Sequence, residues 1–203
     1  MGLIDLENSL IEGCLKNDRK AQKFLYKKYA PEMINVCMRY CRNRSIAEEA
    51  MQEAFLKVFI KIGQLKDPNK LRGWIKQIMV NSSLMKLRKK EKLVFLGDEL
   101  LEGIHTDDIY IDNSYHYTES DLKQILSDMP KGYKVIFNMY VHDDYSHKEI
   151  AKMLNISEST SKSQLSRARN YLKLKLLNIK HEYYSMDNLG LLGSIACVYN
   201  TVF

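Results

Sequence analysis

The sequence contains few residues that interrupt a helix and no pattern that builds a sheet. Only three prolines and nine glycines occur among its 203 residues. No long segment alternates between apolar and polar residues, as a half-buried strand would. Apolar residues recur instead at the spacing of an α-helix along most of the chain. We therefore expect an all-α protein.

Cysteine is scarce, and the four that occur do not form a complete metal site. Cys37 and Cys41 are one helical turn apart and could supply two ligands, but none of the five histidines has ligand spacing with them. A structural zinc needs four ligands, so we interpret both cysteines as small buried hydrophobic residues. The N-terminus shows no secretory signal, which predicts a cytoplasmic chain with reduced thiols. We predict no metal and no cofactor.

The motifs of common enzyme classes are missing as well. We find no glycine loop for phosphates, no nucleophile elbow and no His/Glu set at metal spacing, and so predict that the chain is not an enzyme. Residues 189–203 are nearly uncharged and apolar, but a bilayer span needs about 20 residues. We expect no membrane insertion. This tail could be disordered, pack on the C-terminal domain or bind a partner, and the sequence does not choose among these.

Charge is distributed in blocks. The chain carries a net charge of +6, but residues 1–92 hold +10, residues 93–121 hold −8, residues 122–180 hold +6 and residues 181–203 hold −2. Two basic blocks separated by an acidic one suggest two nucleic-acid-binding modules on a tether. We expect a helical domain at 1–92, a flexible acidic linker at 93–117, a second helical domain at 118–180, and a tail at 181–203.

Helix signals place the elements inside both domains. In the first we expect helices at 4–16, 18–29 and 31–41, a fourth capped by Ser45 and ending near Lys61, and a fifth at 71–91. Turn residues at 67–69 predict a loop before the fifth helix. A stripe at positions 46, 50, 54, 58 and 62, widened by 51, 55 and 59, should face the core. In the second domain we expect helices at 119–129 and 131–142, followed by two more, and the linker has a weak helical signal at 97–103.

The segment 145–169 has the layout of a helix-turn-helix. Ser146 and Glu149 form a capping box for a short helix. Asn155 stands where the chain must turn, and it tolerates the left-handed conformation. Ser157 can cap a second helix, in which Leu165 and further apolar residues share one face. The opposite face carries hydroxyls and cations that can approach phosphates and base edges: Ser159, Lys162, Ser163, Ser166, Arg167 and, near its edge, Arg169.

Three segments together resemble a known family. They are AQKFLYKKYAPEMINVCMRYCRNRSIAEEAMQEAFLKVF (21–59), LRGWIKQIMVNSSLMKLRKK (71–90) and MPKGYKVIFNMYVHDDYSHKEIAKMLNISESTSKSQLSRAR (129–169). In this order they are similar to regions 2.1–2.2, 2.3–2.4 and 4 of bacterial RNA polymerase sigma factors of the sigma-70 family, group IV or extracytoplasmic-function type. The resemblance implies a protein that binds core RNA polymerase, directs it to promoters through −35 and −10 elements, and stabilises the melted duplex. It also implies an anti-sigma factor as a partner.

The resemblance assigns roles by position. The positions that match the polymerase-docking helix are Glu49, Gln52, Glu53 and Leu56. Those that match or could serve the −10 element are Lys66, Asn69, Lys70, Arg72, Lys76, Asn81, Lys86, Arg88, Lys89 and Lys90. Those expected at the −35 element are Ser146, Ser157, Ser159, Thr160, Lys162, Ser163, Ser166, Arg167 and Arg169.

Two residues of the second helix depart from the commonest family pattern. Ser161 stands where a buried valine is usual, and we expect its hydroxyl to bond the backbone carbonyl one turn back. Gln164 stands where arginine is usual, and we expect weaker attraction to phosphate there. A rival interpretation is a two-domain regulator in which a sensor domain precedes a LuxR-like helix-turn-helix. The basic segment 71–90 argues against it, because a sensor domain has no need of such a surface.

Overall fold

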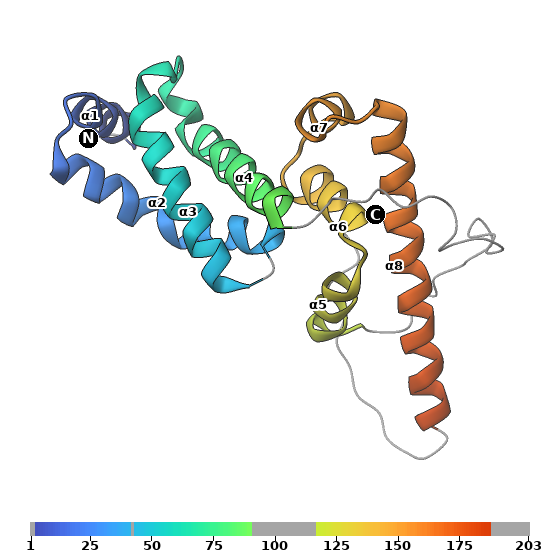
Figure 1. Cartoon of the computed structure of the whole chain (residues 1–203). Coiled ribbons are helices and arrows are strands. Elements are labelled where there is room, and N and C mark those ends of the chain that lie inside the picture. The colour runs from blue at the N-terminus through green and yellow to red at the C-terminus, as the bar shows by residue number, and fades with distance from the viewer. Residues whose placement is uncertain (1–2, 42, 91–116, 188–203) are drawn as a thin grey trace. The chain divides into compact units, whose positions relative to one another are not determined.

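The computed structural model describes residues 3–41, 43–90 and 117–187, and the regular elements in these ranges are all helical (Figure 1). The predicted all-α fold is confirmed. The chain divides into two compact units, Met1–Leu93 and Val94–Phe203. In the described ranges, no helix is both long and apolar enough to cross a bilayer.

The described part of unit 1 is a helical bundle. Its elements are α1 (Leu3–Leu15), α2 (Arg19–Tyr40), α3 (Arg44–Lys61), the 3-10 turns η1 (Ile62–Gln64) and η2 (Pro68–Lys70), and α4 (Leu71–Lys90). Helix α3 packs against both α2 and α4. Three alanines on its buried side, at positions 47, 50 and 54, are fully covered. Because alanine is small, the neighbouring helices can approach α3 closely.

Pro31 does not divide α2, and the predicted break between two helices at 18–29 and 31–41 is wrong. An internal proline removes one backbone hydrogen bond and costs about 3 kcal/mol. Buried side chains continue past it, from Leu25 to Met33 and Val36, on the side of α2 that faces the core. Burying such side chains contributes about 1.5–3 kcal/mol each, so continuous packing outweighs the missing bond.

The start of α3 also differs from the prediction. Asn43, rather than Ser45, is the N-cap, and its side chain accepts a hydrogen bond from the backbone N–H of Ile46 at 3.0 Å. The predicted stripe is buried at positions 50, 54, 58 and 62, while Ile46 is half-buried and Ala47 takes its place in the core. The helix begins one to two residues earlier than predicted, because Asn43 is as good a cap as serine.

The described part of unit 2 holds α5 (Glu119–Asp128), α6 (Lys131–Phe137), the π-helical turn η5 (Asn138–His142), α7 (His147–Leu154) and α8 (Glu158–Asp187). The predicted helix at 131–142 is therefore α-helical only to Phe137, and the Asp143 N–H bonds the carbonyl of Asn138 in the wider π pattern. Helix α8 packs on α5, α6 and α7. It runs past residue 180, where the C-terminal domain was expected to end.

The predicted linker at 93–117, its weak helix at 97–103 and the apolar stretch from Leu189 onward lie outside the described residues, except for Tyr117, which is buried.

Candidate nucleic-acid and polymerase interfaces

The turn between α7 and α8 has the predicted local chemistry. The Ser146 Oγ accepts from the Glu149 N–H at 3.3 Å, and the Glu149 carboxylate accepts from the Ser146 N–H at 2.9 Å. Asn155 lies in the left-handed region, with φ 56 and ψ 51. The Ser157 Oγ then accepts from the Thr160 N–H at 2.9 Å at the start of α8. The capping box, the Asn155 turn and the second cap are confirmed, so the helix-turn-helix geometry is encoded locally.

Helix α8 presents two different sides along its first four turns. Its buried side includes Leu165, Ala168 and Leu172, as predicted. Its exposed side carries Ser159, Lys162, Ser163 and Ser166, with one acid, Glu158, at the start of the helix. Residues at i, i+3, i+4 and i+7 share one face of a helix, so these four side chains form a continuous polar surface. We call this surface the α8 polar face.

The remaining residues predicted for the −35 element are engaged within the protein. Ser146 and Ser157 act as caps, and the Thr160 hydroxyl lies 2.8 Å from the Ser157 Oγ. Arg167 and Arg169 are half-buried. The Arg169 guanidinium lies 6.0 Å from the centre of the Tyr140 ring, which draws it away from the α8 polar face.

Ser161 and Gln164 are both buried, and two expectations about them are wrong. The Ser161 Oγ shares a hydrogen bond of 2.9 Å with the His147 Nδ1 and does not turn to the carbonyl one turn back. Gln164 is 1% exposed, so it faces the interior and has no bearing on phosphate attraction. The expectation about Gln164 came from the family pattern, in which arginine is usual at this position. The packing of α8 against the preceding helices covers it.

His147 links the two helices of the motif and was not identified from the sequence. Besides the bond to Ser161, its ring stacks on Tyr140 with centres 4.6 Å apart and planes at 25°. Burial, followed by the charges of Lys162 and Arg169, lowers the pKa of His147 below its usual value. The imidazole is therefore held neutral at neutral pH. The sequence signal was weak, because His147 and Ser161 are 14 positions apart.

In unit 1, the loop before α4 is stabilised by hydrogen bonds to one of its own side chains, the Asp67 carboxylate. The Asp67 carboxylate accepts hydrogen bonds from the backbone and side-chain N–H groups of Asn69, both at 3.1 Å. Lys66, Asn69 and Lys70 are exposed around it. The loop thus presents two cations and an amide to solvent on a short rigid turn.

The residues of α4 that were predicted for the −10 element do not share one face. At about 100° per residue, Asn81 and Arg88 lie on the side of α4 opposite Arg72 and Lys76. Asn81 and Arg88 are exposed and Lys76 is half-buried. The Arg72 guanidinium pairs with Glu32 of α2, with an Nη2 to Oε1 distance of 2.8 Å. The side chains of Lys89 and Lys90 lie outside the described residues.

Lys86 belongs to the side of α4 that faces α3. Its Nζ lies 2.6 Å from a Glu49 oxygen and 2.5 Å from a Glu53 oxygen, and its side chain is 11% exposed. Hydrogen bonds to Glu49 and Glu53 raise the pKa of Lys86 above its usual value. Its charge is therefore compensated by two of the carboxylates that were predicted for polymerase docking.

Helix α3 carries an exposed stripe beside this ion pair. Glu49, Gln52 and Glu53 are exposed, and Leu56 is 63% exposed, as the sequence suggested. Ile60, one turn further on, is 82% exposed and was missed. Its position four residues after Leu56 was the available signal. We call Glu49, Glu53, Leu56 and Ile60 the α3 stripe. Large exposed apolar side chains beside charges are typical of a protein interface.

The cysteine pair has the environment of buried thiols. Cys37 is 0% exposed and Cys41 is half-buried. Burial raises the pKa of the Cys37 thiol to about 11 and also raises that of Cys41. The described residues contain no group of three or more His, Cys, Asp or Glu side chains placed to hold a metal ion.

Comparison with known proteins identifies the family. Residues 25–93 match the family model for Sigma-70 region 2, and residues 120–172 match that for Sigma-70, region 4. The chain belongs to the sigma-70 family. Among its relatives, the ECF RNA polymerase sigma factor SigM of Bacillus subtilis (strain 168) is 28% identical over 153 residues, covering 73% of this chain and 91% of SigM. The ECF RNA polymerase sigma factor SigW of the same organism is 24% identical over 177 residues, covering 81% and 93%.

The chain is therefore a sigma factor of the extracytoplasmic-function type, and it directs promoter-specific transcription initiation without being an enzyme. The rival interpretation as a sensor-domain regulator is wrong, because the N-terminal match is to region 2. A solved structure of CnrH in complex with the cytosolic domain of CnrY aligns with 86% of this chain and 98% of that chain, at 15% identity and a TM-score of 0.48. That likeness is too weak to support a conclusion about this sigma factor.

Proposed function

We propose that the α8 polar face enters the major groove at the −35 element. Three small hydroxyl side chains and Lys162 are exposed together on the α8 polar face, so the helix can approach the groove closely. Hydroxyls can bond either phosphates or base edges, and Lys162 can bond a phosphate or the acceptors of guanine. The observation that carries this proposal is the separation of this face from the buried side of α8.

The loop with η1 and η2 is our proposed contact with the −10 element. A base flipped from the stack needs a polar rim and nearby cations. Lys66, Asn69 and Lys70 are exposed on a loop that Asp67 holds in place. Asn81 and Arg88, on the exposed side of α4, would contact the strand further along. Capture of unpaired bases would offset the unstacking of the duplex, which costs a few kcal/mol per base.

The α3 stripe is our proposed docking surface for core polymerase. We assign Lys86 to this surface and not to DNA, because it is bound to Glu49 and Glu53. The ion pairs with Lys86 hold the carboxylates of Glu49 and Glu53 in place. Leu56 and Ile60 supply the exposed apolar surface that a partner could bury. Buried apolar anchors inside a polar rim provide most of the affinity of such interfaces.

The remaining assignments follow from family membership. We propose that residues 1–92 form the domain for core polymerase and the −10 element, and that residues 118–180 form the domain for the −35 element. We also propose a cytoplasmic location and control by an anti-sigma factor. The exposed Leu56 and Ile60 support a covering partner, since free apolar side chains of this size favour association.

Two lysines of α8 provide a matched test of the −35 proposal. Lys162→Ala should slow initiation by reconstituted holoenzyme on a promoter fragment and lower the salt dependence of binding by about one phosphate contact, a slope change of about 0.9. Lys175→Ala changes an exposed lysine of the same helix about 20 Å further on, at 1.5 Å per residue. It should leave both quantities unchanged. Equal effects of the two substitutions would contradict the placement of α8.

A separate pair tests polymerase docking. Leu56→Asp should weaken binding of the fluorescently labelled chain to core polymerase by at least about 30-fold, which is the roughly 2 kcal/mol expected of an interface anchor. Lys61→Ala, at the exposed end of the same helix, should bind normally. Since Leu56 is 63% exposed, the unfolding midpoint of the variant should match that of the parent. Normal polymerase affinity of Leu56→Asp would exclude the α3 stripe as the docking surface.

A further inference from the structure

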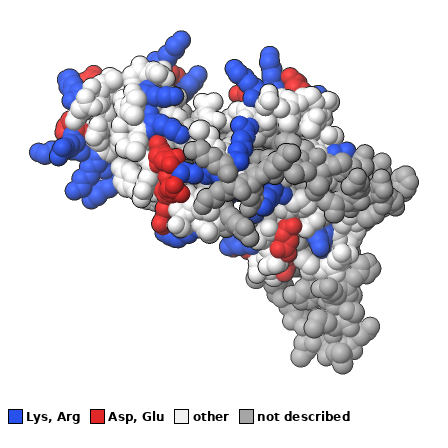
Figure 2. Space-filling view, viewed as in Figure 1, with Lys and Arg blue, Asp and Glu red and all other residues white. Residues whose placement is uncertain are grey.

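A group of cations lies at the end of unit 1 where α1 meets α2, and the assignments above leave it without a role. Lys and Arg side chains crowd this end (Figure 2). Five of them are exposed, in the turn after α1 and along one side of α2, and none forms an ion pair with another described residue: Lys16, Arg19, Lys20, Lys23 and Lys27. Lys28 differs, because its Nζ pairs with Glu7 at 2.8 Å.

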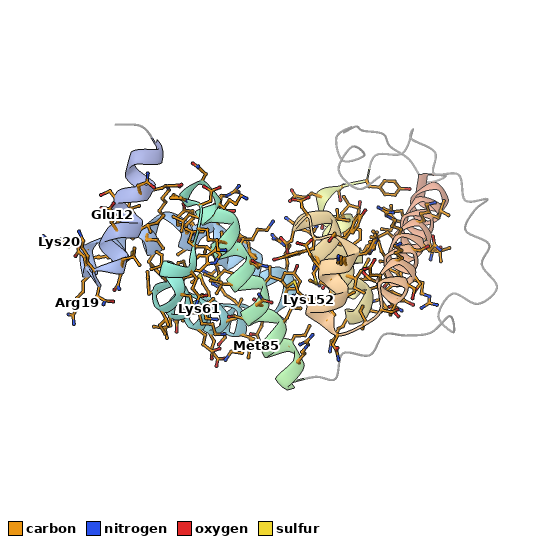
Figure 3. All side chains as sticks on the ribbon, turned by 90° about the horizontal axis from the view of Figure 1, so that it is seen from above. Glu12, Arg19, Lys20, Lys61, Met85 and Lys152 are labelled. Atoms are coloured by element: carbon orange, nitrogen blue, oxygen red, sulfur yellow. The ribbon has the colours of Figure 1, made fainter. Side chains whose placement is uncertain are left out.

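Two of these cations, Lys16 and Lys20, line a hollow together with Phe24. A depression of about 470 Å³ opens between α1 and α2, and Lys16, Lys20 and Phe24 are among the residues that line it. Phe24 is 49% exposed although it is a large aromatic side chain. Ser9, Glu12 and Asp18 add polar groups to the wall, and Glu12 lies at the same end as Arg19 and Lys20 (Figure 3). The volume is within the range of small-ligand sites.

The combination of cations, an exposed ring and polar acceptors fits one kind of ligand best. Single-stranded nucleic acid binds through phosphates on a basic surface and bases stacked on aromatic rings. Ser9 and Glu12 can accept hydrogen bonds from the amino groups of a base. An anionic lipid surface would meet the same cations but would have no use for a carboxylate inside the hollow.

The hollow is also connected to the proposed −10 loop. The Leu15 side chain lies against Gly63 of η1, where an added Cβ would come within 3.3 Å of it. The next residue, Lys16, lines the hollow. Helix α1 further packs against η2. A strand held at the loop therefore has a basic surface next to it, where the chain leaves α1 at Lys16.

We propose that this end of unit 1 binds single-stranded promoter DNA that continues beyond the −10 loop, with one base on Phe24 and the phosphates on Lys16, Lys20 and Lys23. The inference rests on the proposed function, because it requires a melted strand at the −10 loop. It adds a second, sequence-tolerant contact that stabilises the open complex.

Cross-linking in holoenzyme locates the strand directly. Phe24 is replaced by p-benzoylphenylalanine in the full chain, and open complexes with core polymerase on a premelted promoter template are irradiated. The non-template strand should become covalently attached. Arg44, exposed at the end of α3 opposite to η1, carries the same replacement as a control and should give no DNA adduct. Attachment at Phe24 to a polymerase subunit, or to anionic vesicles added as competitor, would overturn the proposal.

A charge variant measures the strength of the contact. Lys16→Gln, Lys20→Gln and Lys23→Gln together remove three phosphate partners. At about 0.7 per contact for single strands, the slope of log affinity against log salt should fall by about 2, and dissociation of the open complex should be at least about 10-fold faster at low salt. The single Arg44→Gln variant, which removes an exposed cation at the opposite end of α3 from η1, should behave as the parent.

The outcomes separate this inference from the proposed function. Lys70→Ala changes the −10 loop alone. If it weakens open complexes while the triple variant leaves their lifetime and salt slope within twofold of the parent, the loop proposal stands and this inference fails. If Lys70→Ala also has no effect, the −10 assignment fails. A loss in the triple variant with an adduct at Phe24 supports both.

Discussion

His147→Ala should loosen the helix-turn-helix more than any other single change outside the apolar core of unit 2. Its partner, the Ser161 hydroxyl, is 0% exposed. Leaving a buried hydroxyl without its partner costs about 1–3 kcal/mol. Losing the stacked contact with Tyr140 costs about 0.5–1.5 kcal/mol more. The sum, about 1.5–4.5 kcal/mol, is a large part of the stability of a small domain.

Amide hydrogen exchange of the full chain measures this loss of stability locally, within the helix-turn-helix. Amides of α7 and the first half of α8 should exchange roughly 10- to 1,000-fold faster in His147→Ala, since about 1.4 kcal/mol corresponds to a factor of 10. Amides of α3 in unit 1 provide an internal reference and should be unchanged. Lys148→Ala, at the exposed neighbouring position, is the matched control and should exchange like the parent.

A double-mutant cycle tests whether the hydrogen bond between His147 and Ser161 causes the loss of stability, as well as how large that loss is. In a Ser161→Ala background no hydroxyl is left stranded, so His147→Ala should cost only the ring contact, about 0.5–1.5 kcal/mol. The coupling between the two positions should therefore be about 1–3 kcal/mol. Additive effects of the two substitutions would refute the reasoning, because they would show that the hydrogen bond contributes nothing specific.

Three further predictions concern stability. Because the folded state lowers the pKa of His147, the unfolded chain takes up more protons below about pH 6.5, and the stability of α7 should fall as pH drops below that value. The protection factors of α7 amides, which are corrected for the slower intrinsic exchange at low pH, should fall accordingly in the parent and not in His147→Ala. Gly13→Ala should destabilise unit 1 in urea, because an added Cβ would come within 2.5 Å of a neighbouring side chain, whereas Gly73→Ala, with open space, should gain about 0.5–1 kcal/mol. Asn155→Val should cost about 1–2 kcal/mol at the left-handed turn, and circular-dichroism melts would detect it.

Features determined by neighbouring residues could be predicted from the sequence. The Ser146 capping box, the left-handed Asn155 and the alternation of exposed and buried residues in α8 all depend on residues a few positions apart. Local chemistry alone therefore gave the helix-turn-helix and the exposed polar residues of its second helix, whereas Gln164 and the two partly covered arginines needed the fold.

Features that depend on contacts between helices could not be predicted in the same way. Pro31 was expected to begin a separate helix, but buried side chains on both sides of it pack as part of one continuous α2. Lys86 was expected to face phosphates, yet it pairs with residues 33 and 37 positions earlier in the chain. The pairing of Arg72 with Glu32 spans 40 positions. The sequence shows where lysines and arginines occur. Only the fold shows which of them already form ion pairs within the protein.

Run-off transcription tests the central claim most directly. Purified core polymerase is supplied with a supercoiled promoter library, with and without the full chain. The account predicts new start sites that appear only with the protein and share two upstream elements at a fixed spacing, and it predicts that Lys162→Ala weakens selection of the upstream element. Sequence-specific binding of duplex DNA by the chain alone, with no new transcript in the presence of polymerase, would contradict it.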